Sequence, residues 1–588
     1  MPTVRRLFGF LRPYRRAVIG SLFFAWLAMG MTVLIPWLVG RAVGAIESGE
    51  RPDLLPLALV LIAAGILRLG LTVVRRLIAG KVSLAVEFDL RERMYEQLQR
   101  LELGFFDSQQ TGQLMSRATV DLQSIRFFLG YGLIFLTQNL LTIVLASALM
   151  IALEPWLALL ALLPVPFVVV TAMRFSKLNR PALQEVQQRV AELTAEAEES
   201  ISGIRVVKAF AREEHMLARF QRSVARVFDQ NVYSTRLRAF YSPLLGFIPS
   251  IGLAVVLFLG GREVIAGSMS LDDFTTFYFL LIMLTGPMRM LGMALGMAQR
   301  AVASGNRMFE ILDRAPRITS PPDAPALPAG PGHVSLSDVT LTYGGEPALV
   351  GVSLEVDAGR TVALVGPTGS GKTSLVALLA RLYDPTEGTV AIDGADLREV
   401  DVASVRRGVA FVADESFLFS ASVAENIAYA RPEATREEVE RAARLARADG
   451  FIRELPDGYD TVVGDRGLTL SGGQRQRVAI ARALLADPRV LILDDATSSV
   501  DARTEAEIKR GLAEVMAGRT TFIVAHRLST ISLADEIVVM DEGRVVDRGA
   551  HEELLERCAL YREIAEHGCE DRVFLQRDLE EREEAVRL

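Results

Sequence analysis

Long apolar runs fill the first half of the chain, and each has the length that a lipid bilayer requires. Four of them carry no charged residue: Ala17 to Gly40, Phe127 to Leu153, Pro155 to Met173 and Ala239 to Gly261. Two more begin at Leu54 and Phe274 and meet Arg68 and Arg289, respectively. Since about twenty apolar residues cross a bilayer, the pattern predicts six transmembrane helices. We expect the two arginines to snorkel or to lie beyond the hydrocarbon edge, with contact to a substrate as the alternative.

Basic residues indicate the orientation of these helices. Five arginines precede the first run: Arg5, Arg6, Arg12, Arg15 and Arg16. Cytoplasmic segments carry an excess of Lys and Arg, so we expect a cytoplasmic N-terminus, with residues 1–16 forming a short interfacial helix. The connection after the second run is also basic, and Arg174 to Arg238 alternates apolar and charged residues at helical spacing. The helices are therefore predicted to continue well beyond the membrane.

The second half of the chain has the pattern of an α/β protein. A stretch rich in Pro, Ala and Gly between Arg314 and His333 indicates a linker. Strand-like and helical runs then alternate, which is typical of a largely parallel sheet. We expect a transmembrane domain with its interfacial helix at residues 1–313, a linker at 314–333, an α/β domain at 334–570 and a charged tail at 571–588.

The amino-acid composition adds to this interpretation only by excluding other classes of protein. Hydrophobic residues make up 50% of the 588 positions and charged residues 23%, which excludes a disordered or fibrous chain. The net charge of −7 indicates no basic face, so no nucleic-acid partner is expected. The cysteines, Cys558 and Cys569, both lie in the polar C-terminal region, which excludes a disulfide framework.

The strongest chemical motif lies directly after the strand-like run Thr361 to Val365. It reads Gly366-Pro367-Thr368-Gly369-Ser370-Gly371-Lys372-Thr373-Ser374 and matches a phosphate-binding P-loop between a strand and a helix. Its glycines allow backbone N–H groups to face phosphates. Lys372 would reach the β- and γ-phosphates, and the Thr373 hydroxyl would hold Mg²⁺. The motif predicts a nucleotide site.

Two later motifs extend this chemistry. Asp494 ends an apolar strand and is expected to help Thr373 hold the metal. Ser471, Gly472, Gly473 and Gln474 open an arginine-rich helix, whose N–H groups and dipole favour an anion. One domain would then carry two phosphate-binding surfaces far apart in sequence. We therefore expect two domains to face each other, each completing the nucleotide site of the other.

Together with Ala525-His526-Arg527, these motifs resemble the nucleotide-binding domain of an ATP-binding-cassette (ABC) transporter. With its six predicted spans, the chain resembles an ABC exporter half-transporter over residues 1 to about 567. The resemblance implies an α-helical membrane domain followed by an α/β P-loop nucleotide-binding domain, with ATP and Mg²⁺ as cofactors. It also implies that Tyr343 stacks on adenine, that His526 contacts the γ-phosphate, and that coupling segments lie near Thr111-Gly112 and at residues 202–208. A loop at residues 464–467 resembles the exporter loop near the signature.

The sequence departs from the family pattern at two positions of its own nucleotide site. Asp495 follows Asp494, where the family has a glutamate as general base, and Asp414 stands where the family usually has a glutamine. Aspartate is one methylene shorter, about 1.5 Å of reach, and errors of that size in positioning a water can cost about a hundredfold in rate. Both departures favour a site that binds ATP but hydrolyses it slowly.

The intact Ser471-to-Gln474 motif can still complete a partner's site, so we predict a heterodimer with a second half-transporter. The predicted function is ATP-driven export of amphiphilic or apolar compounds by alternating access. We expect a multi-pass protein of a cell membrane, of the bacterial inner-membrane type, with a cytoplasmic nucleotide-binding domain. Three alternatives remain open: a homodimeric exporter or lipid flippase, an exporter-fold importer such as a siderophore transporter, and a non-transporting ATP-binding regulator.

Overall fold

The computed structural model describes residues 2–47, 54–414, 416–464, 467, 469–495, 515–525 and 528–567. Two compact units make up the chain: residues 1–99 with 110–314, and residues 100–109 with 315–588. The first is the membrane unit and the second the soluble unit. Residues 100–109 lie within the first half of the sequence, yet they pack with the soluble unit.

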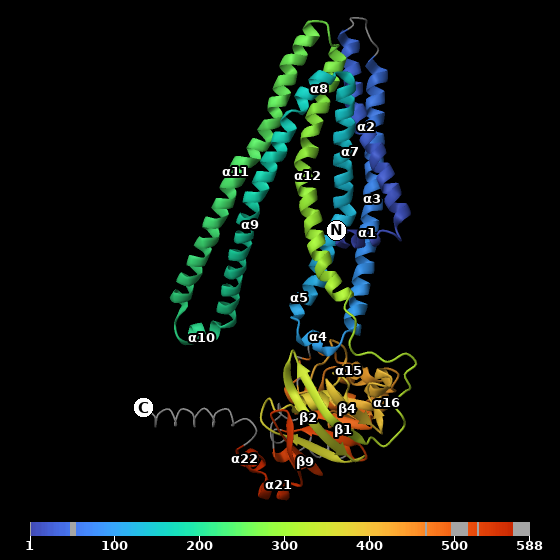
Figure 1. Ribbon diagram of the computed structural model, residues 1–588, viewed down its shortest axis with the longest axis vertical. Helices are drawn as coiled ribbons and strands as arrows, with labels where there is room; N and C mark the ends of the chain where they lie inside the picture. Colours follow the sequence, from blue (N-terminus) through green and yellow to red (C-terminus); the bar gives the residue numbers. More distant parts are fainter. Residues whose placement is uncertain are drawn as a thin grey trace. The chain divides into compact units, whose positions relative to one another are not determined.

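All regular secondary structure in the described part of the membrane unit is helical. Its elements are α1 (Pro2–Gly9), α2 (Arg15–Glu47), α3 (Leu54–Arg100), α5 (Thr111–Ser116), a π-helical turn (Arg117–Asp121), α6 (Leu122–Phe127), a second π-helical turn (Phe128–Gly132), α7 (Leu133–Leu153), α8 (Pro155–Leu162), α9 (Pro164–Ser202), α10 (Ile204–Ala209), α11 (Glu213–Ile265) and α12 (Leu271–Leu312). Helices α2, α7 and α12 pack on one another, as do α9 and α11 (Figure 1).

Apolar side chains of this unit lie both inside the bundle and on its surface. Phe277, Leu280 and Val256 are fully buried in a core shared by α7, α8, α11 and α12, whereas Ile19 is 65% and Trp26 63% exposed. Soluble proteins rarely expose large apolar patches to water. We therefore assign this surface to contact with lipid. Five described helical segments are long and apolar enough to cross a membrane. The sixth predicted span falls in α12 and stays a prediction.

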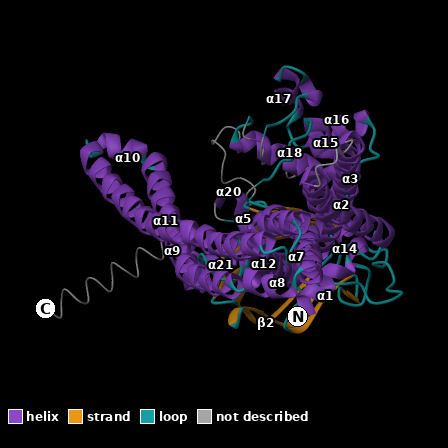
Figure 2. Cartoon of the chain, turned by 90° about the horizontal axis from the view of Figure 1, so that it is seen from above, coloured by secondary structure: helices purple, strands orange, loops and turns teal. Residues whose placement is uncertain are grey.

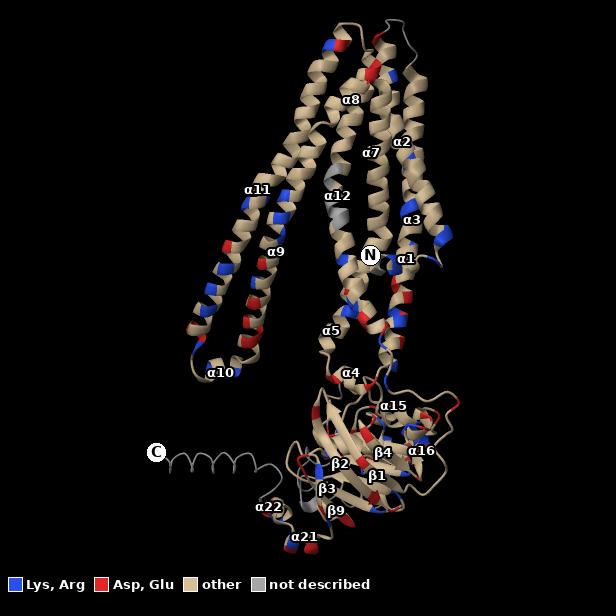
Figure 3. Ribbon diagram, viewed as in Figure 1, with Lys and Arg blue, Asp and Glu red and all other residues tan. Residues whose placement is uncertain are grey.

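Helices α9 and α11 form a long antiparallel hairpin joined by α10. Seen from above, they lead away from α7, α8 and α12 (Figure 2). Charged residues are concentrated on the halves of α9 and α11 nearest α10 (Figure 3), where the buried Glu196 carboxylate accepts a 2.5 Å hydrogen bond from the Ser223 hydroxyl. The continuous helices confirm that the spans extend well past their apolar segments.

The soluble unit contains two sheets. The six-stranded sheet has the order β10-β9-β3-β8-β7-β6, and the four-stranded sheet has the order β2-β1-β4-β5. The strands are β1 (Val334–Tyr343), β2 (Glu346–Val356), β3 (Thr361–Val365), β4 (Glu387–Ile392), β5 (Ala395–Asp396), β6 (Val409–Val412), β7 (Val490–Asp494), β8 (Thr520–Val524), β9 (Glu536–Asp541) and β10 (Arg544–Gly549). All pairs of the larger sheet are parallel except β9–β10.

Burial explains why the larger sheet is parallel. Every residue of β3, β7 and β8 is buried, which is typical of strands covered on both faces. The surrounding helices are α4 (Leu103–Asp107), α13 (Lys372–Leu379), α14 (Val402–Gly408), α15 (Val423–Ile427), α16 (Arg436–Leu445), α17 (Asp449–Glu454), α18 (Gly472–Leu485), α20 (Leu528–Ile531), α21 (His551–Arg557) and α22 (Ala559–His567). The parallel sheet agrees with the sequence pattern, whereas the antiparallel sheet was not predicted.

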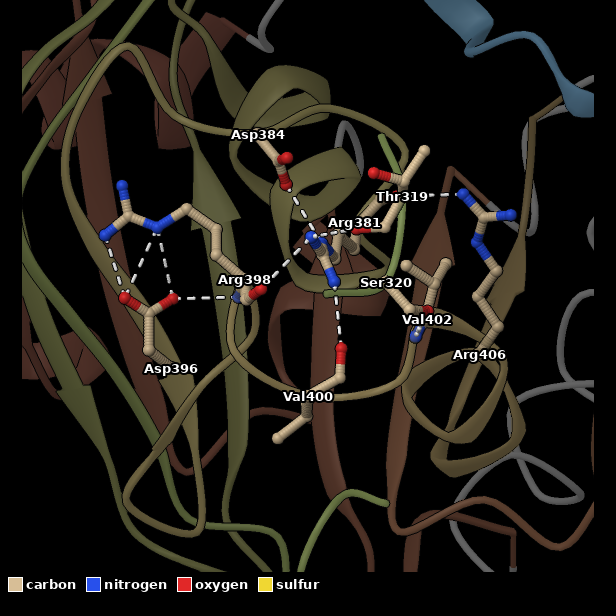
Figure 4. Close-up of polar contacts among 9 residues, drawn as sticks. All are labelled: Thr319, Ser320, Arg381, Asp384, Asp396, Arg398, Val400, Val402 and Arg406. Carbon is tan, nitrogen blue, oxygen red and sulfur yellow. Dashed lines mark hydrogen bonds and ion pairs between the residues drawn. The ribbon is translucent and has the colours of Figure 1, made fainter. Parts of the chain in front are cut away.

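The proline-rich stretch after residue 314 is held along the soluble unit by hydrogen bonds. The buried Arg381 donates to the carbonyls of Thr319 at 3.2 Å and Val400 at 3.1 Å and to the Asp384 carboxylate at 3.0 Å (Figure 4). The Ser320 hydroxyl donates to Asp401 at 3.0 Å. Prolines prevent a regular strand here, but they leave carbonyls that Arg381 can satisfy, so this stretch is anchored rather than a free tether.

Arg381→Met should destabilise the soluble unit, because the Thr319 and Val400 carbonyls and the Asp384 carboxylate lose their shared buried partner. We expect the free energy of unfolding to fall by about 3 kcal/mol or more, measured by urea denaturation of the detergent-solubilised chain with circular dichroism. Arg407→Met is the control: that side chain is 75% exposed, and its loss should change stability by no more than about 0.5 kcal/mol. Equal effects of the two substitutions would contradict this role for Arg381.

Candidate functional site

The predicted P-loop connects β3 to α13 through a backbone that requires glycine. Gly369 and Gly371 have φ of +84° and +96°. A Cβ on Gly366 would lie 2.1 Å from the Met540 carbonyl oxygen, and one on Gly371 would lie 2.6 Å from that of Ala348. Neighbouring backbone therefore approaches the loop too closely for any side chain at these positions. The sequence spacing predicted this curled loop, and the structure contains it.

The buried lysine of the loop lies against the loop's own carbonyls. Lys372 Nζ donates to the Gly366 and Pro367 carbonyl oxygens, each at 2.8 Å. The Ser370 side chain is buried beside it, at 3.4 Å from Nζ. These contacts hold an ammonium group against the loop, where the motif predicts that phosphates bind.

The two predicted metal ligands lie together. Thr373 Oγ1 is 3.4 Å from Asp494 Oδ1, across 121 residues of sequence. Neighbouring ligands of an octahedral Mg²⁺ with bonds of about 2.1 Å are separated by about 3 Å, so this hydroxyl and this carboxylate fit a magnesium ion. Mg²⁺ is usually held in proteins by one or two carboxylates plus substrate phosphates, and Asp494 would be such a carboxylate.

Parallel pairing brings the acidic positions to one edge of the sheet. Asp494 ends β7, Asp414 follows β6 by two residues, and the P-loop follows β3. Strands β6, β7, β8 and β3 are consecutive neighbours with the same direction, so their carboxyl ends share this edge. Ligands of open parallel sheets bind at such an edge. Asp414 is exposed there.

Asp495 has its backbone fixed on both sides. Its N–H donates to the Val524 carbonyl at 3.1 Å, and its carbonyl accepts from Gln476 Nε2 at 3.2 Å. Its φ of +46° lies in the left-handed region, which few residues other than glycine adopt. The backbone at the predicted general-base position is therefore tied to both β8 and α18.

Tyr343 ends β1 and has a partly exposed ring, as adenine stacking would require. It is 37% exposed, and its ring meets that of Tyr383 edge-on, with centroids 5.0 Å apart. Burial raises the pKa of the Tyr343 phenol, and a hydrogen bond with Ser374, next to the P-loop threonine, opposes that shift. The hydroxyl therefore stays neutral at physiological pH.

The predicted signature forms the N-terminus of α18. The Ser471 hydroxyl accepts from the Gln474 N–H at 3.3 Å, and the Gln474 side chain accepts from the Ser471 N–H at 2.8 Å. This capping box leaves Ser471 exposed, whereas Gly473 is buried. The exposed serine and helix N-terminus are available to a second molecule.

Four positions of the predicted motifs cannot be placed, and one relevant residue was not predicted. His526 and Arg527 lie outside the described residues, as do Asp465 and Arg466 of the loop before the signature. Gln476, 1% exposed, was missed because one polar residue on an apolar helix face gives no sequence signal for its backbone partner.

Comparison with known proteins identifies the architecture in which this site occurs. Residues 18–288 match the family model of the ABC transporter transmembrane region, and residues 349–498 match that of the ABC transporter domain. An uncharacterized ABC transporter ATP-binding protein of Bacillus subtilis, YknU, is 38% identical over 96% of this chain and 97% of its own length.

Relatives with functional names match over a similar extent. An ATP-dependent lipid A-core flippase of Syntrophus aciditrophicus is 37% identical over 95% of this chain and 94% of its own length. A multidrug efflux ATP-binding/permease protein of Mycobacterium tuberculosis is 39% identical over 95% of this chain but only 47% of its own length. A solved bacterial Atm1-family ABC exporter with ATP bound matches with a TM-score of 0.78 and 31% identity, covering 94% of this chain and 97% of that one.

Gly371→Ala should weaken ATP binding at least about tenfold, because its Cβ collides with the Ala348 carbonyl and opens the phosphate cradle. Gly359→Ala is the matched control: φ is +76°, but no atom lies within 4 Å of the added Cβ. Both substitutions cost similar backbone strain, and only the first should change the Kd of a fluorescent ATP analogue. The interpretation is wrong if both variants bind ATP like the unaltered chain.

Proposed function

The chain belongs to the ABC transporter family and has the architecture of an exporter half-transporter, and on that premise we propose that it works as the slow-hydrolysing subunit of a heterodimer. ABC exporters couple ATP binding and hydrolysis to transport, and the family identifies this chain as a multi-pass membrane protein with a cytoplasmic nucleotide-binding domain. What is proposed is the division of labour between this chain's nucleotide site and its partner's.

Asp495 is the observation that supports this proposal. A glutamate at this position would reach about 1.5 Å further. The chain cannot recover that reach by moving its backbone, because Asp495 is bonded to Val524 on one side and Gln476 on the other. The attacking water would therefore be misplaced, at a cost of about a hundredfold in rate. Binding would be retained, since the cradle and the Thr373–Asp494 pair are complete.

Asp414 adds a second reason for slow hydrolysis. A carboxylate at this edge brings negative charge toward the same anionic phosphates, and it accepts hydrogen bonds where an amide could also donate one. Two departures in one site, beside an intact signature, favour a chain whose partner supplies the fast site. The Mycobacterium tuberculosis relative is consistent with such pairing, because this chain matches about half of its length.

An amphiphilic or apolar compound is the proposed substrate class. Relatives that match more than three-quarters of this chain are named for lipid A-core, multidrug or fatty acid transport. The last predicted span contains five methionines, Met283, Met288, Met290, Met293 and Met297, and thioether side chains adapt to varied apolar ligands. A homodimeric lipid flippase is the second candidate, favoured by the 37% identity to a lipid A-core flippase.

Substitution of Asp495 tests the division of labour. In a complex with a half-transporter that has the glutamate, Asp495→Asn should leave at least about half of the steady-state ATPase activity, while neutralising the partner's glutamate should abolish it. In the chain purified alone, Asp495→Glu should raise the turnover, by up to about a hundredfold. Rapid ATP hydrolysis by the unaltered chain alone would instead favour a homodimer with two working sites.

Substitution of Ser471 tests whether this chain completes the partner's site. Ser471→Ala should lower the ATPase rate of the heterodimer at least about tenfold, because the partner's γ-phosphate loses a hydrogen-bond donor. Ser422→Ala is a matched control, since Ser422 begins α15 with the same capping box and its loss removes a cap alone, about 1 kcal/mol. Equal rates in the two variants would contradict a role in trans for Ser471.

A further inference from the structure

Residues 100–109 pack with the soluble unit through the short helix α4. Phe105 of this helix is 4% exposed, and the Glu102 carboxylate accepts from the Arg317 N–H at 3.1 Å. Gly104 approaches the Tyr383 ring so closely that a Cβ there would lie 3.1 Å from Cε1. Three contacts therefore fix the position of α4 in this unit: apolar burial, a hydrogen bond to a backbone N–H, and a close approach at a glycine.

Tyr383 lies between α4 and Tyr343. Its hydroxyl is hydrogen-bonded to the Asp107 carboxylate, 276 residues away in sequence, and its ring meets the Tyr343 ring with centroids 5.0 Å apart and planes at 75°. Burial raises the pKa of Asp107, as expected for a carboxyl enclosed by this contact. Edge-to-face geometry of this kind is a favourable aromatic pair and fixes the orientation of both rings.

The segment that carries Tyr383 is itself rigidly held. Arg381, two residues earlier, is the buried guanidinium that bonds Asp384, Val400 and Thr319 (Figure 4), and the Leu382 N–H donates to the Ala377 carbonyl at 2.9 Å. Tyr383 therefore has a fixed base, and a displacement of its ring must be accommodated by Tyr343 or α4.

We propose that Tyr383 is a positioning residue that orients Tyr343 for adenine and makes the seating of α4 depend on whether adenine is bound. This inference rests on the proposed adenine-stacking role of Tyr343. Adenine on the exposed face of Tyr343 restricts that ring, which restricts Tyr383 and stabilises its bond to Asp107. Because such coupling is reciprocal, a seated α4 also strengthens the binding of ATP.

Competition binding separates orientation of Tyr343 from general stability. Full-length protein in detergent is titrated with a fluorescent ATP analogue, which is displaced by ATP or by inorganic tripolyphosphate. Tyr383→Leu should weaken the binding of ATP by about 2- to 10-fold, the range of an aromatic pair. The affinity for tripolyphosphate should stay unchanged, because only ATP carries an adenine to contact Tyr343. A parallel loss for both competitors would show a structural role and overturn the proposal.

Hydrogen exchange tests the link to α4 without removing the ring. ATP should slow backbone exchange in a peptide covering residues 101–109 of the unaltered chain. Tyr383→Phe and Asp107→Asn, which alter the bond between Tyr383 and Asp107, should lose at least half of that protection while the ring pair stays in place. Tyr429→Phe is the control, because it removes a hydroxyl from a residue of the same unit that is 59% exposed. In this variant, ATP should protect residues 101–109 as it does in the unaltered chain.

Each outcome identifies which assignment fails. ATP-induced protection of residues 101–109 that is unchanged in Tyr383→Phe and Asp107→Asn would overturn the link to α4. Tyr343→Ala provides the separate test of the premise: if that variant binds ATP as tightly as the unaltered chain, the adenine-stacking assignment fails. If Tyr343→Ala weakens ATP binding but Tyr383→Leu does not, the assignment of Tyr343 stands and that of Tyr383 fails.

Discussion

Parallel pairing of β3, β8, β7 and β6 is the constraint on which the whole nucleotide site depends. Strands β3, β7 and β8 are buried on both faces, so their side chains contribute packing and their chemistry is confined to their ends. Since all four run in one direction, the P-loop, Asp494 and Asp414 reach the same edge. The 3.4 Å approach of Thr373 to Asp494 therefore results from sheet order, although 121 residues separate them.

The same sheet also bears on the proposed slow hydrolysis. Asp495 follows β7 directly, and its backbone continues the ladder to Val524 before Gln476 bonds it from the other side. A side chain that is one methylene short could be compensated only by a mobile backbone, and this one is attached to a wholly buried strand. The packing that brings Thr373 and Asp494 together thus also holds the backbone of the shorter carboxylate in place.

Sequence predicted the parts of this molecule whose signal is local. Apolar runs show where lipid-facing helices occur, and glycine spacing shows the P-loop. Both signals are local because the length of a helix and the conformation of a loop depend on residues that are close together in sequence. The antiparallel sheet was not predicted, since its strands resemble those of the parallel sheet until their partners are known. The contact of Asp107 with Tyr383 joins residues 276 apart, and neither residue carries a pattern that indicates the other.

A pocket that holds ATP without splitting it has a physical use in a paired transporter. A ligand at one hundred times its Kd stabilises the state that binds it by about 2.7 kcal/mol. Retained at the site of Lys372 and Thr373, ATP would keep two domains associated while the other pocket releases product. Reclosure of that pocket would then be an intramolecular step at high effective concentration. The proposed slow hydrolysis at one site would thereby make repeated closure at the other easier.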